Sequence, residues 1–245
     1  MLVQIYEIQT PHEAEKCISL GVDRLGSVLL SEEEWRQPLI REVIRLTEGT
    51  EVRNSLIPLF HREETLYRSL EYYNPHFIHF CDSLTDDRGT PLDLQGSISL
   101  QGRIRERFPR VRIIRSIPIP PEGMALQLPI LALAKALEPV SDLFLIDTWL
   151  GKEPVEGYIG ITGRQADRQR AAELVRKSGI PVILAGGLSP DNVYDALMQV
   201  RPAGADSCTH TNALDEAGLP DRFKKDFQKV ERFVQEVRRA EKALP

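Results

Sequence analysis

Residues 182–193 read VILAGGLSPDNV, and this stretch contains a strand, a turn and the start of a helix. The apolar run Val182–Ala185 is typical of a strand buried on both faces, as in parallel sheets. Gly186 and Gly187 follow at once, and glycine allows positive φ and a close approach of backbone to a ligand. The segment 189–192, Ser-Pro-Asp-Asn, then places capping side chains and a proline where a helix begins. The stretch therefore predicts one strand–loop–helix unit of an α/β fold.

The same unit recurs along the whole chain, as short β-branched runs that alternate with amphipathic, charge-rich segments. The predicted strands are Leu2–Tyr6, Arg24–Leu29, Glu51–Leu56, Phe77–Phe80, Arg112–Ile117, Leu143–Ile146, Val182–Ala185 and Ala205–Ser207. The predicted helices are Pro11–Leu20, Glu33–Thr47, Glu63–Tyr73, Asp93–Arg107, Met124–Leu137, Ala166–Ser178, Asp191–Val200 and Phe223–Ala243. Eight units in strict alternation predict a parallel, eight-stranded (β/α)8 TIM barrel formed by residues 1–245 as a single domain.

An open, doubly wound α/β sheet is the alternative architecture. Such a sheet usually carries a glycine-rich phosphate turn after its first strand. The first predicted strand ends at Tyr6, and the turn after it, residues 7–10, reads Glu-Ile-Gln-Thr and contains no glycine. The pattern therefore favours the closed barrel.

Composition limits the classes of partner. The chain has 245 residues, of which 42% are hydrophobic and 27% charged, and its formal net charge is −5. No basic tract stands out, so we expect no nucleic-acid partner and no anionic membrane surface. No apolar run reaches the ~20 residues of a membrane helix, and the first residues do not resemble a signal peptide. We expect a cytoplasmic protein, a monomer or homodimer, that requires no cofactor.

A metal site is not expected either. The three cysteines lie far apart in the sequence, and the five histidines show no tight ligand spacing. The one cluster of metal-ligand types is His79, Cys81 and Asp82 at the end of the fourth predicted strand, with Cys208 or His210 as ligands from the opposite side.

The pair Gly186-Gly187 is the strongest candidate for a binding site. In (β/α)8 barrels the loops after strands seven and eight frequently hold a phosphate group. Backbone amides next to glycine and before a helix are suited to bind an anion. The alternative is a tight turn that needs positive φ and binds nothing. The sequence therefore predicts a phosphorylated small molecule as ligand, with Ser207, Thr209 and His210 contributing from the eighth strand.

The run LAGGLSPDNVYDALMQVRPAGAD, residues 184–206, resembles the C-terminal third of the phosphoribosylanthranilate isomerases, as do Lys224-Lys225-Asp226 and Lys229-Val230 further along. The resemblance extends to Leu145-Ile146-Asp147-Thr148 and to Gly160-Ile161-Thr162-Gly163. It implies a (β/α)8 barrel of tryptophan biosynthesis that performs an Amadori rearrangement of a phosphoribosyl amine. In that reaction a general acid protonates the furanose ring oxygen and a general base removes the C2 proton.

The resemblance assigns the general acid to Asp147, and the mouth of a barrel is also where catalytic groups gather. A carboxyl group buried there would have the raised pKa that an acid needs near neutral pH. The family's basic cysteine is matched by Tyr6, and the glycine after it by Glu7, so the base is one of these nonstandard residues. A tyrosine, with a pKa near 10, is a poor base unless it is strongly perturbed. Strand alternation is expected to point Glu7 away from the side of Tyr6.

Other positions also depart from the family pattern. After the eighth strand the chain reads Cys208-Thr209-His210 where the family has small residues, so His210 either restricts a phosphate group or donates to it. Arg36 lies near a family arginine that contacts the anthranilate carboxylate. Arg115, in the fifth predicted strand, either faces the lumen as an anion partner or forms an outward salt bridge.

Three hypotheses follow from this pattern. The chain is an isomerase of the phosphoribosylanthranilate type with a nonstandard base, or a relative that acts on another phosphorylated sugar or amine, or a binding protein that kept the phosphate site and lost the base.

Overall fold

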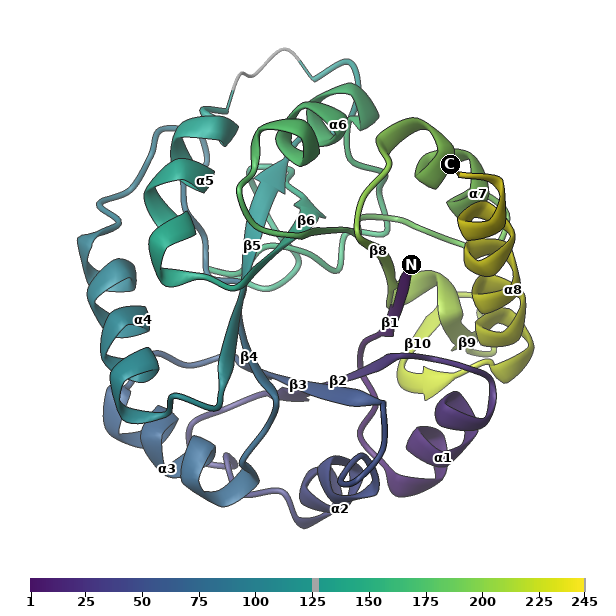
Figure 1. The fold of residues 1–245 in the computed structure, drawn as a ribbon, viewed down its shortest axis with the longest axis horizontal. Coiled ribbons are helices and arrows are strands. Elements are labelled where there is room, and N and C mark those ends of the chain that lie inside the picture. The colour runs from purple at the N-terminus through teal and green to yellow at the C-terminus, as the bar shows by residue number, and fades with distance from the viewer. Residues whose placement is uncertain (125–127, 245) are drawn as a thin grey trace.

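The computed structural model describes residues 1–124 and 128–244. Eight parallel strands close into a barrel in sequence order, and the strands are joined by helices on the outside (Figure 1). The strands are β1 (Leu2–Ile5), β2 (Arg24–Leu29), β3 (Arg53–Pro58), β4 (Phe77–Phe80), β5 (Arg112–Ile119), β6 (Leu143–Thr148), β7 (Val182–Leu184) and β8 (Gly204–Ser207). Parallel pairing of Leu2 with Gly204 and of Ile5 with Ser207 closes the barrel between β1 and β8.

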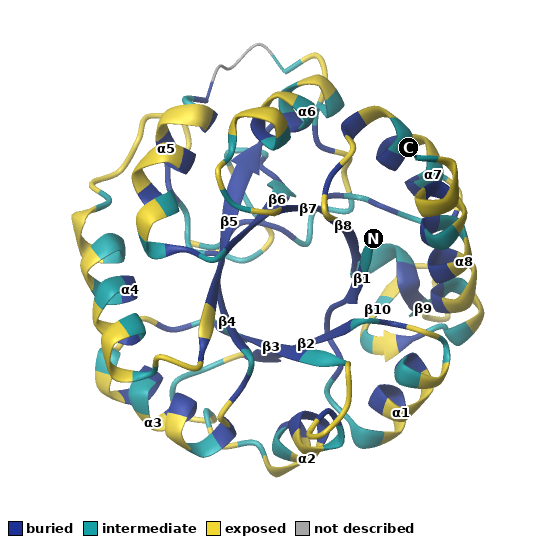
Figure 2. Ribbon diagram, viewed as in Figure 1, coloured by how far each residue is buried: buried dark blue, intermediate teal, exposed yellow. Residues whose placement is uncertain are grey.

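Helices α1–α8 surround this barrel. They are α1 (Pro11–Ser19), α2 (Pro38–Leu46), α3 (Glu63–Tyr73), α4 (Gln95–Arg107), α5 (Ile130–Leu137), α6 (Arg168–Lys177), α7 (Val193–Val200) and α8 (Phe227–Ala243), with short 3-10 turns η1 (Glu138–Val140) and η2 (Thr209–Thr211). Their inward faces are buried and their outward faces are exposed (Figure 2). The predicted parallel eight-stranded barrel is therefore confirmed.

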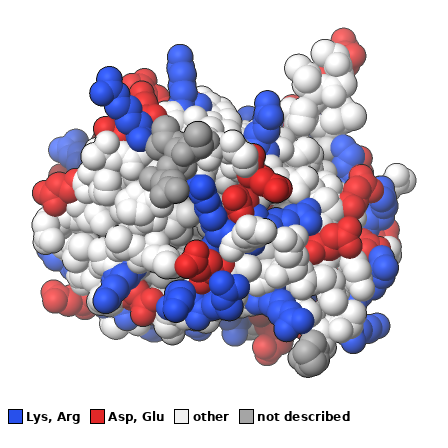
Figure 3. Space-filling view, turned by 90° about the horizontal axis from the view of Figure 1, so that it is seen from above, with Lys and Arg blue, Asp and Glu red and all other residues white. Residues whose placement is uncertain are grey.

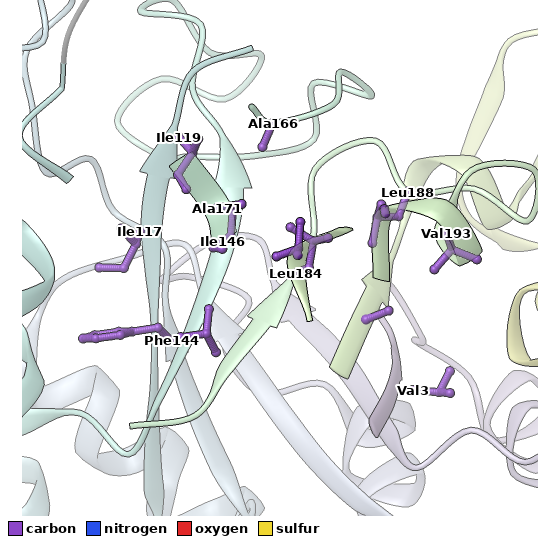
Figure 4. Close-up of a cluster of buried hydrophobic side chains, with 14 of the residues drawn as sticks. Val3, Ile117, Ile119, Phe144, Ile146, Ala166, Ala171, Leu184, Leu188 and Val193 are labelled. Carbon is purple, nitrogen blue, oxygen red and sulfur yellow. The ribbon is translucent and has the colours of Figure 1, made fainter. Parts of the chain in front are cut away.

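The largest apolar cluster lies between the strands and the helices. Ile117, Phe144 and Leu184 project from neighbouring strands, and Ala171 of α6 and Val193 of α7 belong to the same cluster (Figure 4). Burial of such side chains contributes roughly 25 cal/mol per Å² of apolar surface removed from water. This layer fixes the strand register, so it also fixes where each strand ends at the mouth of the barrel.

The lumen has a separate and partly polar filling. Tyr6, Phe77, Ile114 and Leu145 form a smaller apolar cluster on the inward side of the strands. The polar side chains of Gln4, Arg24, Ser55, His79, Ser116 and Asp206 are buried as well. Buried polar groups are costly unless they find hydrogen-bond partners. Polar groups buried in this lumen are therefore candidates for a functional site at the mouth of the barrel.

Several predicted boundaries change in the structure. The helix predicted at Glu33–Thr47 starts only at Pro38, and that predicted at Asp191–Val200 starts at Val193. The helix predicted at Met124–Leu137 begins at Ile130, and residues 125–127 of that prediction lie outside the described residues.

The largest correction concerns the predicted helix Phe223–Ala243. This helix begins at Phe227, because the carboxylate of Asp226 accepts hydrogen bonds from the amides of Gln228 and Lys229 and caps it there. The residues before the cap form an unpredicted antiparallel hairpin of β9 (Asn212–Leu214) and β10 (Pro220–Lys225). This hairpin contributes to the site described below.

The surface carries charges of both signs. Lys and Arg side chains alternate with Asp and Glu side chains over the face in Figure 3, and neither sign dominates it. Among the helices in the described part of the chain, none combines the length and apolar character needed to cross a bilayer.

Candidate active site

A cavity of about 70 Å³ opens at the carboxyl ends of the strands. Its polar lining comes from β4, β5, β6, β8 and β10, from the residues directly after β1, β4 and β8, and from the loop after β6. Its apolar lining comes from β2, β3, β6 and the loops after β3 and β6. The polar and titratable side chains of this lining belong to Tyr6, Glu7, His79, Cys81, Ser116, Asp147, Tyr158, Asp206, Cys208 and Arg222. A second hollow of about 30 Å³ lies beside it at the ends of β7 and β8. Asp147 and Asp206 line both spaces, so they mark the junction between the cavity and the hollow.

Asp147 lies near the end of β6 with its carboxylate directed into the cavity. Its Oδ1 accepts a hydrogen bond of 2.8 Å from the amide of Thr148. Its Oδ2 faces the backbone of Gly160, where a Cβ atom would lie 2.3 Å from that oxygen, so only glycine fits opposite the carboxylate. Burial raises the pKa of Asp147 to about 7. A carboxyl group with this pKa is protonated often enough near neutral pH to act as an acid.

The Tyr6 side chain extends across the lumen and lines the cavity. Its ring covers Gly26 of β2, where a Cβ atom would lie 2.0 Å from the ring. Its hydroxyl accepts from Ser55 Oγ at 2.8 Å and lies 2.6 Å from His79 Nδ1. His79 Nε2 lies 2.9 Å from Ser116 Oγ, which completes a buried chain over β1, β3, β4 and β5.

The state of this chain is set by burial. Burial raises the pKa of Tyr6 well above its ordinary value, so Tyr6 keeps its proton. Burial, reinforced by Arg115 and Arg24, lowers the pKa of His79 to about 3, so the imidazole is neutral. With Ser55 as donor to Tyr6, the proton of Tyr6 is donated to His79 Nδ1. These contacts argue against Tyr6 as a general base at neutral pH.

Glu7 faces the cavity, contrary to the expectation from strand alternation, because its backbone has a φ of 61° and leaves the strand geometry. Its Oε1 accepts from Arg222 Nε at 2.7 Å, and its Oε2 accepts from Asn212 at 3.3 Å. Burial favours the neutral form, but Arg222 and Lys225 outweigh it and lower the pKa of Glu7. A carboxylate held in this way is a weak base, and its clear role is to fix the β9–β10 hairpin over the barrel.

The second hollow has the shape expected of an anion site. It is lined by Gly163, Gly186, Gly187, Ser207, Thr209 and His210, together with their neighbours. Among the described residues, the amides of Gly186, Gly187 and Leu188 donate no hydrogen bond, so they remain available to a ligand. Their glycines have φ values of 80° and 60°, a region that other residues avoid.

The residues predicted after the eighth strand adopt particular roles in this hollow. His210 Nε2 lies 3.0 Å from the carbonyl of Gly163, and a carbonyl only accepts, so Nε2 carries a proton and donates it there. Ser207 donates its hydroxyl to the carbonyl of Leu188 at 2.9 Å. Both side chains therefore brace the walls of the hollow, while the glycine amides remain free.

Substitution of Gly187 by alanine should disrupt this hollow. A Cβ atom there would lie 2.6 Å from the backbone carbon of Arg164, and the φ of 60° adds strain of about 1–3 kcal/mol. We expect the affinity for inorganic phosphate to fall at least about tenfold, which corresponds to about 1.4 kcal/mol. Isothermal titration with phosphate measures this loss.

Gly49→Ala is the matched control, because Gly49 also has a positive φ of 72° but nothing lies within 4 Å of its added Cβ. This variant should lose some stability and keep its phosphate affinity. Equal phosphate affinity in Gly187→Ala and the wild type would show that the ligand does not use this hollow.

Two predicted anion partners are not brought to the cavity. Arg36 is exposed and lies over the ring of Tyr72, 4.8 Å from its centroid. Arg115 points outward and forms a salt bridge with Asp82, with NH1 2.5 Å from Oδ1. The cluster of His79, Cys81 and Asp82 also separates, because His79 faces the lumen and Asp82 faces Arg115. Among residues 1–124 and 128–244 no group of three or more potential metal ligands converges.

The structure adds site residues that the sequence reading overlooked. Asp206 of β8 is buried, lines both spaces and accepts from Gln4 Nε2 at 2.9 Å. A signal was present, since Asp206 is a carboxylate inside a predicted buried strand. Arg222 and Tyr158 also line the cavity. They come from a hairpin and a loop, whose positions no periodicity in the sequence reveals.

Comparison with known proteins gives one consistent result. The family model described as N-(5'-phosphoribosyl)anthranilate (PRA) isomerase matches residues 112–236. The N-(5'-phosphoribosyl)anthranilate isomerase of Methanocella arvoryzae is 32% identical over 240 residues, which cover 96% of this chain and 97% of that protein.

Solved structures agree at the level of the fold. The N-(5'-phosphoribosyl)anthranilate isomerase of Pyrococcus furiosus superposes with a TM-score of 0.66 at 21% identity, covering 98% of this chain and 99% of that one. A phosphoribosyl anthranilate isomerase in complex with reduced 1-(o-carboxyphenylamino)-1-deoxyribulose 5-phosphate gives a TM-score of 0.65 at 17% identity, covering 97% and 98% of the two chains. That relative therefore binds a phosphorylated ligand in the same fold.

Proposed function

Because the chain belongs to the N-(5'-phosphoribosyl)anthranilate isomerase family, we propose that it isomerises a phosphoribosyl amine of the N-(5'-phosphoribosyl)anthranilate type. The observation that carries the proposal is the junction of the two spaces at Asp147. A raised pKa makes this carboxyl an acid, and a hollow with free glycine amides lies next to it. The reaction needs both features, namely a proton donor at the sugar ring and a binding site for the 5'-phosphate.

Each half of the substrate has a matching surface. The phosphate would bind to the amides of Gly186 and Gly187, with Thr209 and His210 closing the hollow. The ring oxygen of the ribose would then lie near Asp147, whose proton opens the furanose. The aryl group would extend into the central cavity, whose walls include Ile57 and Tyr158. We propose further that the protein binds a small phosphorylated ligand and acts as a monomer or homodimer. We expect no nucleic-acid or membrane partner.

A second candidate is isomerisation of a smaller phosphorylated sugar or amine. The central cavity measures about 70 Å³, and the pockets that hold drug-sized ligands usually measure about 300–1,000 Å³. Tyr6 and Arg222 are among the large side chains that line this small cavity. An aryl substrate would require the β9–β10 hairpin or the loop after β6 to move outward, whereas a smaller ligand would fit without that movement.

One assay separates these candidates. Purified protein is mixed with freshly prepared N-(5'-phosphoribosyl)anthranilate, and the loss of the fluorescence of the anthranilate amine is followed, with Asp147→Asn measured in parallel. We expect turnover in the wild type and its loss in the variant. Turnover of ribose 5-phosphate instead would favour the smaller substrate. Thermal stabilisation by the phosphorylated compounds without any turnover would contradict both and indicate a binding protein.

A further inference from the structure

The position of the family's basic cysteine is taken by Tyr6, so the proton acceptor of the reaction must be found elsewhere in the cavity. Burial raises the pKa of the Cys81 and Cys208 thiols, which line the cavity and remain protonated. Glu7 is held by Arg222, and Tyr6 and His79 satisfy one another. Burial raises the pKa of Tyr158 to about 12, so its hydroxyl also keeps its proton. Apart from Asp147, the ionisable side chain that remains in the described lining of the cavity is Asp206.

Asp206 lies on the same tier of the barrel as Asp147. The register pairs Ile146 of β6 with Leu184 of β7, and Leu184 with Ala205 of β8. One residue further along each strand, Asp147 and Asp206 lie on either side of Ala185. Neighbouring strands are spaced by about 4.8 Å, so the two backbones are about 10 Å apart and their inward carboxyl groups converge. The small side chain between them leaves room for a ligand atom.

The Asp206 carboxyl is held in one orientation. Its Oδ1 accepts from Gln4 Nε2 at 2.9 Å, and Gln4 Oε1 in turn accepts from Arg24 NH1 at 3.2 Å. Arg24 is itself fixed in the lumen, with its guanidinium 4.0 Å from the centroid of the Phe77 ring. In the described part of the chain Oδ2 has no hydrogen-bond partner, and it is not one of the fully buried unpartnered atoms. Oδ2 therefore faces the cavity.

We propose that Asp206 is the general base of the isomerisation and removes the C2 proton of the substrate opposite the proton donor Asp147. This inference deepens the proposed function and rests on it. Asp206 has a different strand position from the family's cysteine, so it approaches the sugar from β8, beside the phosphate hollow. Asp206 is then a catalytic residue, and Gln4 and Arg24 are positioning residues that direct its free oxygen.

The proton transfers balance over one turnover. The Asp147 carboxyl gives its proton to the ring oxygen, the C1–O bond breaks, and the nitrogen lone pair forms the C=N bond of an iminium ion. Asp206 Oδ2 then takes the C2 proton, the C–H electrons form the C1=C2 bond, and the iminium electrons return to nitrogen. Asp206 delivers its proton to C1 while the 2-hydroxyl proton passes to Asp147, which leaves a C2 ketone. Both carboxyl groups recover their initial states.

Both carboxyl groups of the pair titrate near neutral pH. Burial raises the pKa of Asp206 to about 8, with the charge of Asp147 as a lesser cause, and burial raises the pKa of Asp147 to about 7. The pair therefore carries one proton over the interval between these values, and that proton resides mainly on Asp206. The cycle starts from the minor arrangement of the same singly protonated pair, with the proton on Asp147 and the charge on Asp206. Both arrangements have the same pH dependence, because the apparent values belong to the pair. Activity of the wild type should follow a bell with limbs near pH 7 and pH 8.

The test compares Asp206→Asn with the wild type in the fluorescence assay over pH 6–9. We expect kcat to fall by about 10²–10⁴-fold, the usual contribution of general acid–base catalysis, with a much smaller change in KM. The residual activity should fall as pH rises through about 7 and should lack the rising limb, because only Asp147 still titrates. A substrate deuterated at C2 should react more slowly than the protiated one in the wild type.

Two further variants keep the result interpretable. Asp206→Glu retains the carboxyl group and should recover part of kcat together with the rising limb, even if Asp206→Asn folds poorly. Asp195→Asn removes an exposed carboxylate on α7 and should behave as the wild type. A kcat within fivefold of the wild type in folded Asp206→Asn, or a bell-shaped profile that persists there, would overturn the inference alone. An inactive wild type would overturn the proposed function, and the inference with it.

Discussion

Asp147→Asn should abolish most of the activity and at the same time raise the thermal stability of the protein at pH 8. The loss of kcat is expected to be about 10²–10⁴-fold, because asparagine cannot protonate the ring oxygen. The side chain keeps its shape, and the amide oxygen can still accept the hydrogen bond of the Thr148 amide. A rate loss through misplacement of the loop is therefore not expected.

The gain in stability has a definite pH dependence. Burial raises the folded-state pKa of Asp147 to about 7, above the ordinary carboxyl value of 3.8. The favourable contribution of the neutral carboxyl is complete below about pH 4 and is lost as pH rises through 7. Asparagine does not ionise, so Asp147→Asn does not lose this stabilisation. Its free energy of unfolding should therefore equal that of the wild type at pH 4 and exceed it by the full amount at pH 8. After allowance for partial exposure we expect roughly 1–2 kcal/mol, or about 2–8 °C in Tm.

The two readouts are measured on one preparation, by the fluorescence assay and by calorimetry at pH 4, 6 and 8. Asp195→Asn, with an exposed carboxylate on α7, should change neither kcat nor Tm. A variant Asp147→Asn that turns over within tenfold of the wild type would remove Asp147 from the chemistry. A Tm that rises equally at pH 4 and pH 8 would show that the stability effect does not come from ionisation of this carboxyl.

The barrel was predictable because strands and helices leave a periodic pattern of apolar residues in the sequence. Runs such as Arg24–Leu29 and Phe77–Phe80 have the bounds that the pattern indicates, and both strands are buried along their whole length. The turn at Gly186-Gly187 was equally predictable, because positive φ favours glycine. An added Cβ atom would also collide with Thr148 Oγ1 at Gly186 or with the Arg164 backbone at Gly187. These features depend on residues that are adjacent in the sequence, so the sequence pattern is sufficient to predict them.

The other side of the site depended on contacts over long sequence separations. Glu7 forms a salt bridge with Arg222 from the opposite end of the chain. Its positive φ breaks the strand alternation that would otherwise point the Glu7 side chain away from the cavity. Tyr6 crosses the lumen only because Gly26, Ser55 and His79 accept it. These contacts join residues from distant segments of the chain. The sequence therefore predicted that Tyr6 and Glu7 depart from the family pattern, but it did not predict which residues they contact.

Asp82→Ala should lower the stability of the protein by about 3–5 kcal/mol, or roughly 6–20 °C in Tm, because it leaves the charge of Arg115 buried without a partner. The Arg115 side chain is 1% exposed, and its NH2 also donates to the Asp82 carbonyl at 2.7 Å. Burial alone would raise the pKa of Asp82, but Arg115 outweighs it and lowers that pKa. The stabilisation is therefore complete above the ordinary carboxyl pKa and is lost only as the pH falls through the lowered value.

Two comparisons decide whether this pair serves stability or the site. Glu71→Ala breaks an exposed pair with Arg107 and should cost no more than about 1 kcal/mol. The double variant Asp82→Leu with Arg115→Met replaces the buried charges by apolar groups and should recover most of the lost Tm. The backbone of Asp82 also forms an isolated antiparallel β-bridge with the backbone of Tyr158, which lines the central cavity. A stable double variant with a raised KM would show that the pair holds this wall in place, whereas an unchanged KM would limit its role to folding.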